Sequence, residues 1–161
     1  MPILNVRIQA EMRDDAGNHL PAPPDMALGQ VGPRVQITLA QLKEQIDAIS
    51  GKGEEVPAPV VGYALIDTGA SATCVDSDAA GRAGLPVVDS GPLHSVTHAN
   101  ETVPIYAGSL TIQGANINLL AHRAYGVNLV EQGLIALIGR DVLSQCILVY
   151  NGPDSSFSIS I

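Results

Sequence analysis

The part of the chain best suited to chemistry is an apolar run that ends in an aspartate. Residues 63–66 (Tyr-Ala-Leu-Ile) are typical of a buried strand, and Asp67 follows them directly, opening a turn with Thr68 and Gly69. A carboxylate there is costly unless hydrogen bonds satisfy it or it holds its proton. Glycine lets backbone N–H groups approach the carboxylate, and the threonine hydroxyl can donate or accept at close range. Taken alone, the stretch is also compatible with a strand ending in an ordinary Asx turn.

A second segment strengthens the functional interpretation. Residues 136–143 (Ala-Leu-Ile-Gly-Arg-Asp-Val-Leu) run from an apolar stretch through Gly139 and Arg140 into a short helical pattern. Together with Ile-Asp-Thr-Gly-Ala-Ser at 66–71, this segment resembles the paired signature of retropepsin-like aspartic proteases. The resemblance covers about residues 60–151.

This resemblance implies a mainly β fold, namely a closed barrel of the acid-protease type with one or two short helices, working as a homodimer. The residues between the two signature segments contain the hairpin that would act as a flap over bound substrate. The site residues it implies are the catalytic Asp67, its supporting Thr68 and Gly69, the substrate-binding Ala70, Ser71, Val96, Thr97, His98 and Ala99, and the structural Gly139 and Arg140.

The implied activity is that of an aspartic endopeptidase acting on an extended polypeptide. Its chemistry needs two aspartates and the chain supplies one good candidate, so a two-fold homodimer would place Asp67 of each subunit at the axis. The pair would activate a water molecule, with no metal and no cofactor required. The alternative is a dimerisation or peptide-binding module that keeps the retropepsin fold without cleaving.

Two further features bear on this interpretation. The triplet Asp89-Ser90-Gly91 is an allowed variant of the signature, but it follows Asp67 too closely for each aspartate to have its own supporting sheet, and we predict a turn. In retroviral enzymes the arginine equivalent to Arg140 pairs with an acid at the position of Ser71. We therefore expect Arg140 to use another acceptor: Asp76, Asp78 or a backbone carbonyl.

Composition bounds the class of protein. The 161 residues carry a formal net charge of −8 with no basic cluster, which argues against nucleic-acid and anionic-membrane partners. No apolar run approaches membrane-spanning length, and the start lacks the apolar block of a secretory signal. Cys74 and Cys146 show no metal-ligand spacing, so we expect reduced core residues of a cytoplasmic protein, with a single disulfide as the less favoured alternative.

The pattern along the chain predicts a single domain over residues 1–161. Residues 1–59 form an extension with a strand, a Pro- and Gly-rich loop and a helix; 60–151 form the protease core, and 152–161 a final strand. Segments 4–8 and 157–161 are expected to contribute to the dimer contact, because the termini of retropepsins interleave in a shared sheet.

Overall fold

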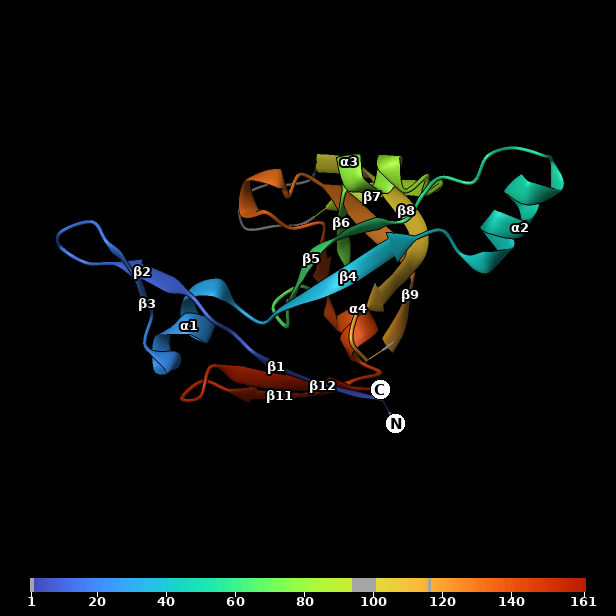
Figure 1. Cartoon of the computed structure of the whole chain (residues 1–161). Helices are drawn as coiled ribbons and strands as arrows, with labels where there is room; N and C mark the ends of the chain where they lie inside the picture. Colours follow the sequence, from blue (N-terminus) through green and yellow to red (C-terminus); the bar gives the residue numbers. More distant parts are fainter. Residues whose placement is uncertain (1, 94–100, 116) are drawn as a thin grey trace.

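A closed barrel forms the centre of the molecule (Figure 1). The computed structural model describes residues 2–93, 101–115 and 117–161. The main sheet has the strand order β4-β5-β10-β6-β9-β8-β7, and a further pairing of β4 with β8 closes six strands into a barrel. This confirms the predicted mainly β, closed-barrel fold. The strands are β4 (Arg34–Ala40), β5 (Val60–Ile66), β6 (Cys74–Asp76), β7 (Val87–Leu93), β8 (Glu101–Ile112), β9 (Ile117–Val127) and β10 (Ala136–Ile138).

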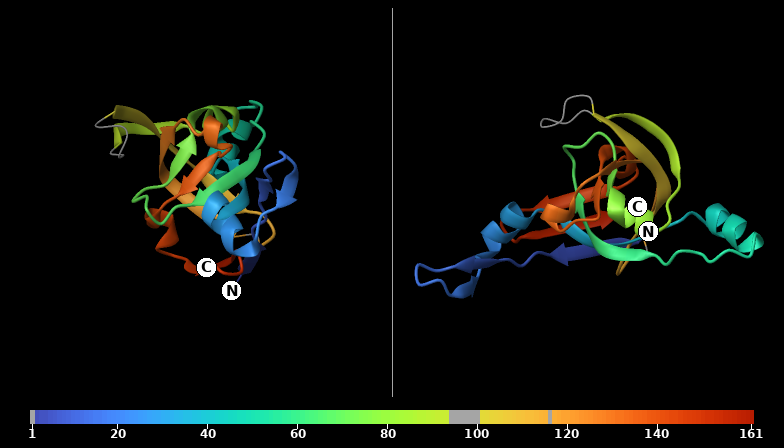
Figure 2. Two further views of the ribbon diagram at one scale, coloured as in Figure 1. Left: turned by 90° about the vertical axis from the view of Figure 1, so that its left-hand side faces the viewer. Right: turned by 90° about the horizontal axis from the view of Figure 1, so that it is seen from above.

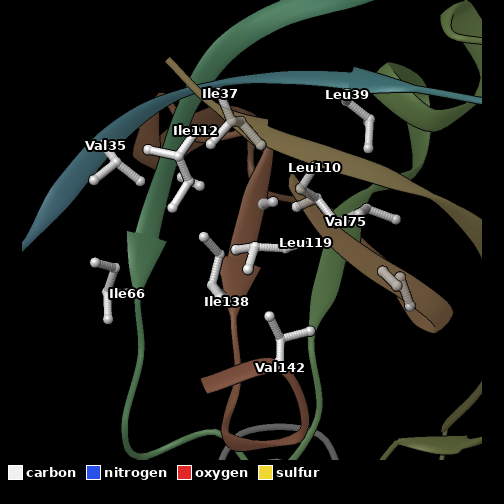
Figure 3. Packing of buried hydrophobic residues seen from close by; sticks show 14 of the residues in the cluster. Val35, Ile37, Leu39, Ile66, Val75, Leu110, Ile112, Leu119, Ile138 and Val142 are labelled. Atoms are coloured by element: carbon white, nitrogen blue, oxygen red, sulfur yellow. The ribbon is translucent and has the colours of Figure 1, made fainter. Parts of the chain in front are cut away.

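The barrel interior is filled by the alternate, inward-facing residues of its strands (Figure 3). Val35, Ile37 and Leu39 of β4 are at most 2% exposed, and they face apolar side chains from β8, β9 and β10. Burying one such side chain contributes roughly 1.5–3 kcal/mol. The closing strand β4 is therefore a core element, although it comes from the first 59 residues.

The connection between β5 and β6 determines where Asp67 lies. These strands are consecutive in sequence, but β10 is inserted between them, parallel to β5 and antiparallel to β6. The intervening segment, residues 67–73, must therefore cross the end of β10 at Ile138 (Figure 3). That crossing brings the two signature segments into contact.

The two ends of the chain pair with each other in a separate three-stranded sheet. It contains β1 (Ile3–Arg7), β12 (Ser156–Ser160) and β11 (Ile147–Asn151) in that order, all antiparallel. Strand β12 is the central strand, and both its edges are paired within this chain, so neither is left for a further strand. The expected contribution of segments 4–8 and 157–161 to a dimer contact stays a prediction. The outer edges of β1 and β11 remain free in this sheet.

The N-terminal extension contains more regular structure than predicted. A small hairpin of β2 (Glu11–Arg13) and β3 (His19–Pro21) precedes helix α1 (Pro24–Val31), where the sequence indicated a loop. Pro24 occupies the first helical position, which proline tolerates, and Ala27 and Leu28 are buried. The side chain of Ser155 anchors the helix by accepting a hydrogen bond from Leu28 N–H and donating one to the Pro24 carbonyl.

Helix α2 (Lys43–Gly51) stands apart from the barrel (Figure 1 and the right-hand view of Figure 2). It ends at Gly51, and none of its residues is fully buried. The start of the helix is capped by Gln45, whose Oε1 accepts from Leu42 N–H at 2.7 Å. Within the described chain, no helix is both long and apolar enough to cross a membrane.

The remaining short elements adjoin the barrel. They are α3 (Ser77–Arg82), the 3-10 turn η1 (Val130–Gln132) and α4 (Arg140–Leu143). The prediction of a turn at residues 89–91 is wrong: they lie within β7, where a bulge between Val87 and Asp89 shifts the register against β8. After the bulge, residues 89–91 pair in regular register with β8, so the strand continues through them.

Candidate active site

Asp67 is half-buried at the end of β5 and is held by backbone groups of its own turn. Its N–H donates to the Ile138 carbonyl at 2.9 Å, which continues the β5–β10 pairing. Its Oδ1 accepts from Gly69 N–H at 2.9 Å and from Ala70 N–H at 3.2 Å. Among the residues the structure describes, Oδ2 accepts no hydrogen bond, so half of the carboxylate remains available for other chemistry.

Glycine at position 69 is explained by this close approach. A Cβ placed on Gly69 would lie 3.1 Å from Asp67 Oδ1, the oxygen that its own N–H binds. Thr68 and Gly69 are both exposed, and the Thr68 hydroxyl makes no hydrogen bond to another described residue. The turn therefore leaves its hydroxyl and one carboxylate oxygen without a hydrogen-bond partner among the described residues.

The second signature segment packs directly under the turn. A Cβ on Gly139 would lie 2.5 Å from the Ala72 carbonyl carbon and 2.8 Å from Thr73 N, so only glycine fits between the two backbones. Arg140 N–H donates to the Ala70 carbonyl at 3.0 Å. These contacts fix the crossing turn to the start of α4.

The acceptors of Arg140 are backbone carbonyls, one of the alternatives that the sequence left open. Its Nη1 donates to the Thr68 carbonyl at 2.8 Å and to the Gly69 carbonyl at 2.9 Å. The other candidates are engaged elsewhere, because Asp76 accepts from Ala79 N–H and Leu129 N–H, and Asp78 pairs with Arg82.

A supporting pair that sequence reasoning missed joins Thr73 to Asp141. Asp141 Oδ2 accepts from Thr73 N–H at 3.0 Å, and its Oδ1 accepts from the Thr73 hydroxyl at 2.8 Å. The Thr73 hydroxyl oxygen in turn accepts from Gly139 N–H at 3.1 Å. The only sequence signal was the position of each residue, since Asp141 directly follows Arg140 and Thr73 closes the turn that Asp67 opens.

The other predicted site residues are only partly brought together. Ala70 and Ser71 lie on the same turn as Asp67, with Ser71 exposed. The expected flap is represented by β7 and β8, which pair up to Leu93 and Glu101. Val96, Thr97, His98 and Ala99 fall outside the described residues, so their role stays a prediction.

The surroundings of the site also affect a thiol. Burial, followed by the negative charges of Asp141 and Asp67, raises the pKa of the Cys74 thiol to about 11. Cys74 and Cys146 are both free, so the alternative of a disulfide is not realised. Within the described ranges, no three His, Cys, Asp or Glu side chains are grouped as metal ligands would be.

Comparison with known families agrees with this geometry. A family model described as "Aspartyl protease" matches residues 53–148, a span that includes both Asp67 and the Gly139–Arg140 segment. The chain therefore belongs to the aspartyl protease family and is retropepsin-like, and a protease-like function follows in general terms. A search among curated proteins returned no match.

Proposed function

We propose that the protein is an aspartic endopeptidase whose active site is shared by two copies of the chain. The observation that carries this proposal is the single Asp67 turn, fixed by β10 and α4, with one carboxylate oxygen bound and the other open. The described part of the chain folds into one barrel with one such turn. A second aspartate in an equivalent environment must come from a second copy, and two-fold symmetry supplies it.

The chemistry follows from bringing the two carboxylates together. At roughly 3 Å they cannot both ionise and so share one proton, as is established for the dyads of aspartic proteases. The ionised member takes a proton from a water molecule between them, while the protonated member polarises the scissile carbonyl. The Gly69 and Ala70 N–H groups keep each carboxylate oriented, and the outward Thr68 hydroxyls bond across the axis. The two apparent pKa values belong to the pair and give activity a bell-shaped dependence on pH.

The substrate would bind as an extended strand over the Asp67 turn. Ala70 and Ser71 form the floor, and the hairpin that β7 and β8 begin forms the roof through Val96, Thr97, His98 and Ala99. An extended polypeptide gains main-chain hydrogen bonds in such a channel, and side-chain pockets add selectivity.

The dimer contact is proposed to involve β11. This strand follows α4, so it lies close in sequence to the signature segment, and its outer edge is free in the terminal sheet. Ile147 and Val149 on it are 60% and 56% exposed. A free apolar edge strand is a template for pairing with another chain. Pairing β11 with its symmetry mate would join the two terminal sheets across the axis.

We further propose cytoplasmic localisation and no nucleic-acid or membrane partner. Both cysteines are free thiols, which suits a reducing compartment. The net charge of −8 disfavours polyanionic partners.

Cleavage of a peptide library between acid and neutral pH tests the proposed activity. We expect cleavage by the wild-type chain and none by Asp67→Asn, a variant of nearly the same shape that cannot form the proton-sharing pair. Cleavage that persists in Asp67→Asn would contradict the proposal. A stable dimer that cleaves nothing at any pH would instead favour the peptide-binding module.

A further inference from the structure

The guanidinium of Arg140 uses only part of its hydrogen-bonding capacity. Its Nη1 donates to the Thr68 and Gly69 carbonyls, while Nε and Nη2 have no acceptor among the described residues. The side chain is exposed, and no carboxylate of the described chain lies within 4.0 Å of it. The undescribed residues 1, 94–100 and 116 contain no Asp or Glu. Arg140 thus presents a charge without a counter-charge from its own chain.

The absence of an ion pair at Arg140 contrasts with the excess of acids in the chain. The chain has 16 Asp and Glu against 8 Lys and Arg, and Arg7, Arg82 and Arg123 each pair with an aspartate, whereas Arg13, Arg34 and Arg140 form no ion pair within the described residues. The aspartates nearest in sequence to the Asp67 turn and to Arg140 are engaged in other bonds. Asp76 caps α3 and binds Leu129 N–H, Asp78 binds Arg82, and both oxygens of Asp141 bind Thr73.

The location of the charge gives it a role. The two carbonyls that Arg140 contacts belong to the residues directly after Asp67, so its guanidinium lies at the edge of the proposed catalytic floor. Ser71, the exposed residue at this part of the floor, is uncharged. A guanidinium with free parallel donors matches a carboxylate, which it can bind through two charge-assisted hydrogen bonds.

We propose that Arg140 is a specificity-determining residue that selects polypeptide substrates carrying an acidic side chain within a few residues of the cleaved bond. The proposal rests on the proposed peptidase function. Arg140 keeps its Nη1 contacts to the turn and binds the substrate carboxylate through Nε and Nη2. The acidic side chain adds affinity and fixes the register of the extended substrate over Asp67.

Matched peptides test this selectivity. A peptide that the wild-type chain cleaves, with both ends blocked so that no terminal carboxylate remains, is remade with Glu or Gln at each position flanking the cleaved bond. We expect kcat/KM for Glu to exceed that for Gln by about 10-fold at one position, the size of one charge-assisted interaction. A ratio near one at every position overturns the proposal.

Three variants assign the ratio to Arg140. Arg140→Gln should bring the ratio to about one, whereas Arg140→Lys keeps a charge and part of the preference. Ser71→Asp leaves the arginine in place but adds a carboxylate to the turn that Arg140 contacts. Because this carboxylate competes with that of the substrate, the variant should also lower the Glu-to-Gln ratio. Arg82→Gln, on α3, is the matched control and should keep it. A Glu-to-Gln ratio that is unchanged in Arg140→Gln contradicts the proposal. If this variant also forms a weaker dimer, the charge of Arg140 serves the contact between subunits and not the substrate.

Binding separates this proposal from the proposed activity. The same Glu and Gln peptides, labelled with fluorescein, are bound to the Asp67→Asn variant, and binding is followed by fluorescence anisotropy. This measurement does not require cleavage. Tighter binding of the Glu peptide that is lost in Asp67→Asn/Arg140→Gln supports the assignment even if no cleavage is seen. Equal binding of both peptides overturns it.

Discussion

Asp67, Arg140 and the residues around them form one hydrogen-bonded unit built on backbone groups. The Asp67 carboxylate is bound by two N–H groups of its own turn, and Arg140 binds two carbonyls of the same turn. Beneath them, Thr73, Gly139 and Asp141 tie the turn to α4. The position of the carboxylate therefore depends on residues that never touch a substrate.

Gly139→Ala tests how tightly the turn is fixed. The added methyl would meet the Ala72 and Thr73 backbones at 2.5–2.8 Å, and neither can move without displacing the Asp67 turn. We expect the free energy of unfolding to fall by about 3 kcal/mol. Gly81→Ala in α3 is the control, because a Cβ there meets nothing within 4 Å, and it should be neutral or slightly stabilising. Equal stability of both variants in urea unfolding would refute the close packing.

The Cys74 thiol predicts a pH dependence of stability. Its pKa in the folded chain is about 11 against an ordinary 9.0, chiefly through burial, so the unfolded chain releases this proton first as the pH rises. The stabilisation by the neutral thiol is present below pH 9 and is lost between pH 9 and 11, by about 2 kcal/mol. Urea unfolding across this range should show a steeper decline for the wild type than for Cys74→Ala. Parallel curves would be inconsistent with this assignment.

Among the elements, those with a clear pattern in their own local sequence were the most predictable. Two such elements are strand β5 with its Asp67 turn and strand β10, which Gly139 follows directly. Each is a contiguous run of apolar residues followed by turn residues. The alternation of Val35, Ile37 and Leu39 with polar residues is likewise typical of a strand, and these residues lie in β4. In each case the local pattern and the tertiary structure favour the same conformation.

The elements that could not be predicted depend on distant contacts. Helix α1 has only two buried residues, too few for an amphipathic pattern, and its anchor Ser155 lies near the other end of the chain. The Thr73–Asp141 pair joins residues 68 positions apart. The strand through Asp89 contradicts its local turn propensity, because pairing with β8 outweighs it.

Ser155→Ala tests the long-range anchor of α1. The variant leaves the buried Leu28 N–H without an acceptor and removes the bond to the Pro24 carbonyl. We expect a loss of about 1–2 kcal/mol in the free energy of unfolding, with faster hydrogen exchange confined to α1. Ser50→Ala, on the exposed α2, is the control and should change neither quantity. Unchanged exchange in α1 would count against the anchor.

At the scale of the whole molecule, we propose that residues 1–161 form one domain. The first 59 residues supply β4, which pairs with both β5 and β8, and β1, which pairs with β12. A chain starting at residue 60 should therefore show no cooperative thermal unfolding by circular dichroism. Replacing residues 44–54 by a short Gly-Ser loop should keep it, since α2 buries none of its residues. A cooperatively folding 60–161 fragment would contradict the proposal.

The most direct test of the shared active site is to mix the wild-type chain with Asp67→Asn at a fixed wild-type concentration and follow peptide cleavage. If each site needs one Asp67 from each copy, mixed dimers are inactive, and an equal amount of the variant leaves about half of the activity after subunit exchange. Further additions should lower it in proportion to the wild-type fraction. Activity that stays constant as the variant is added, with sedimentation confirming that mixed dimers form, would contradict a site built from two copies of Asp67.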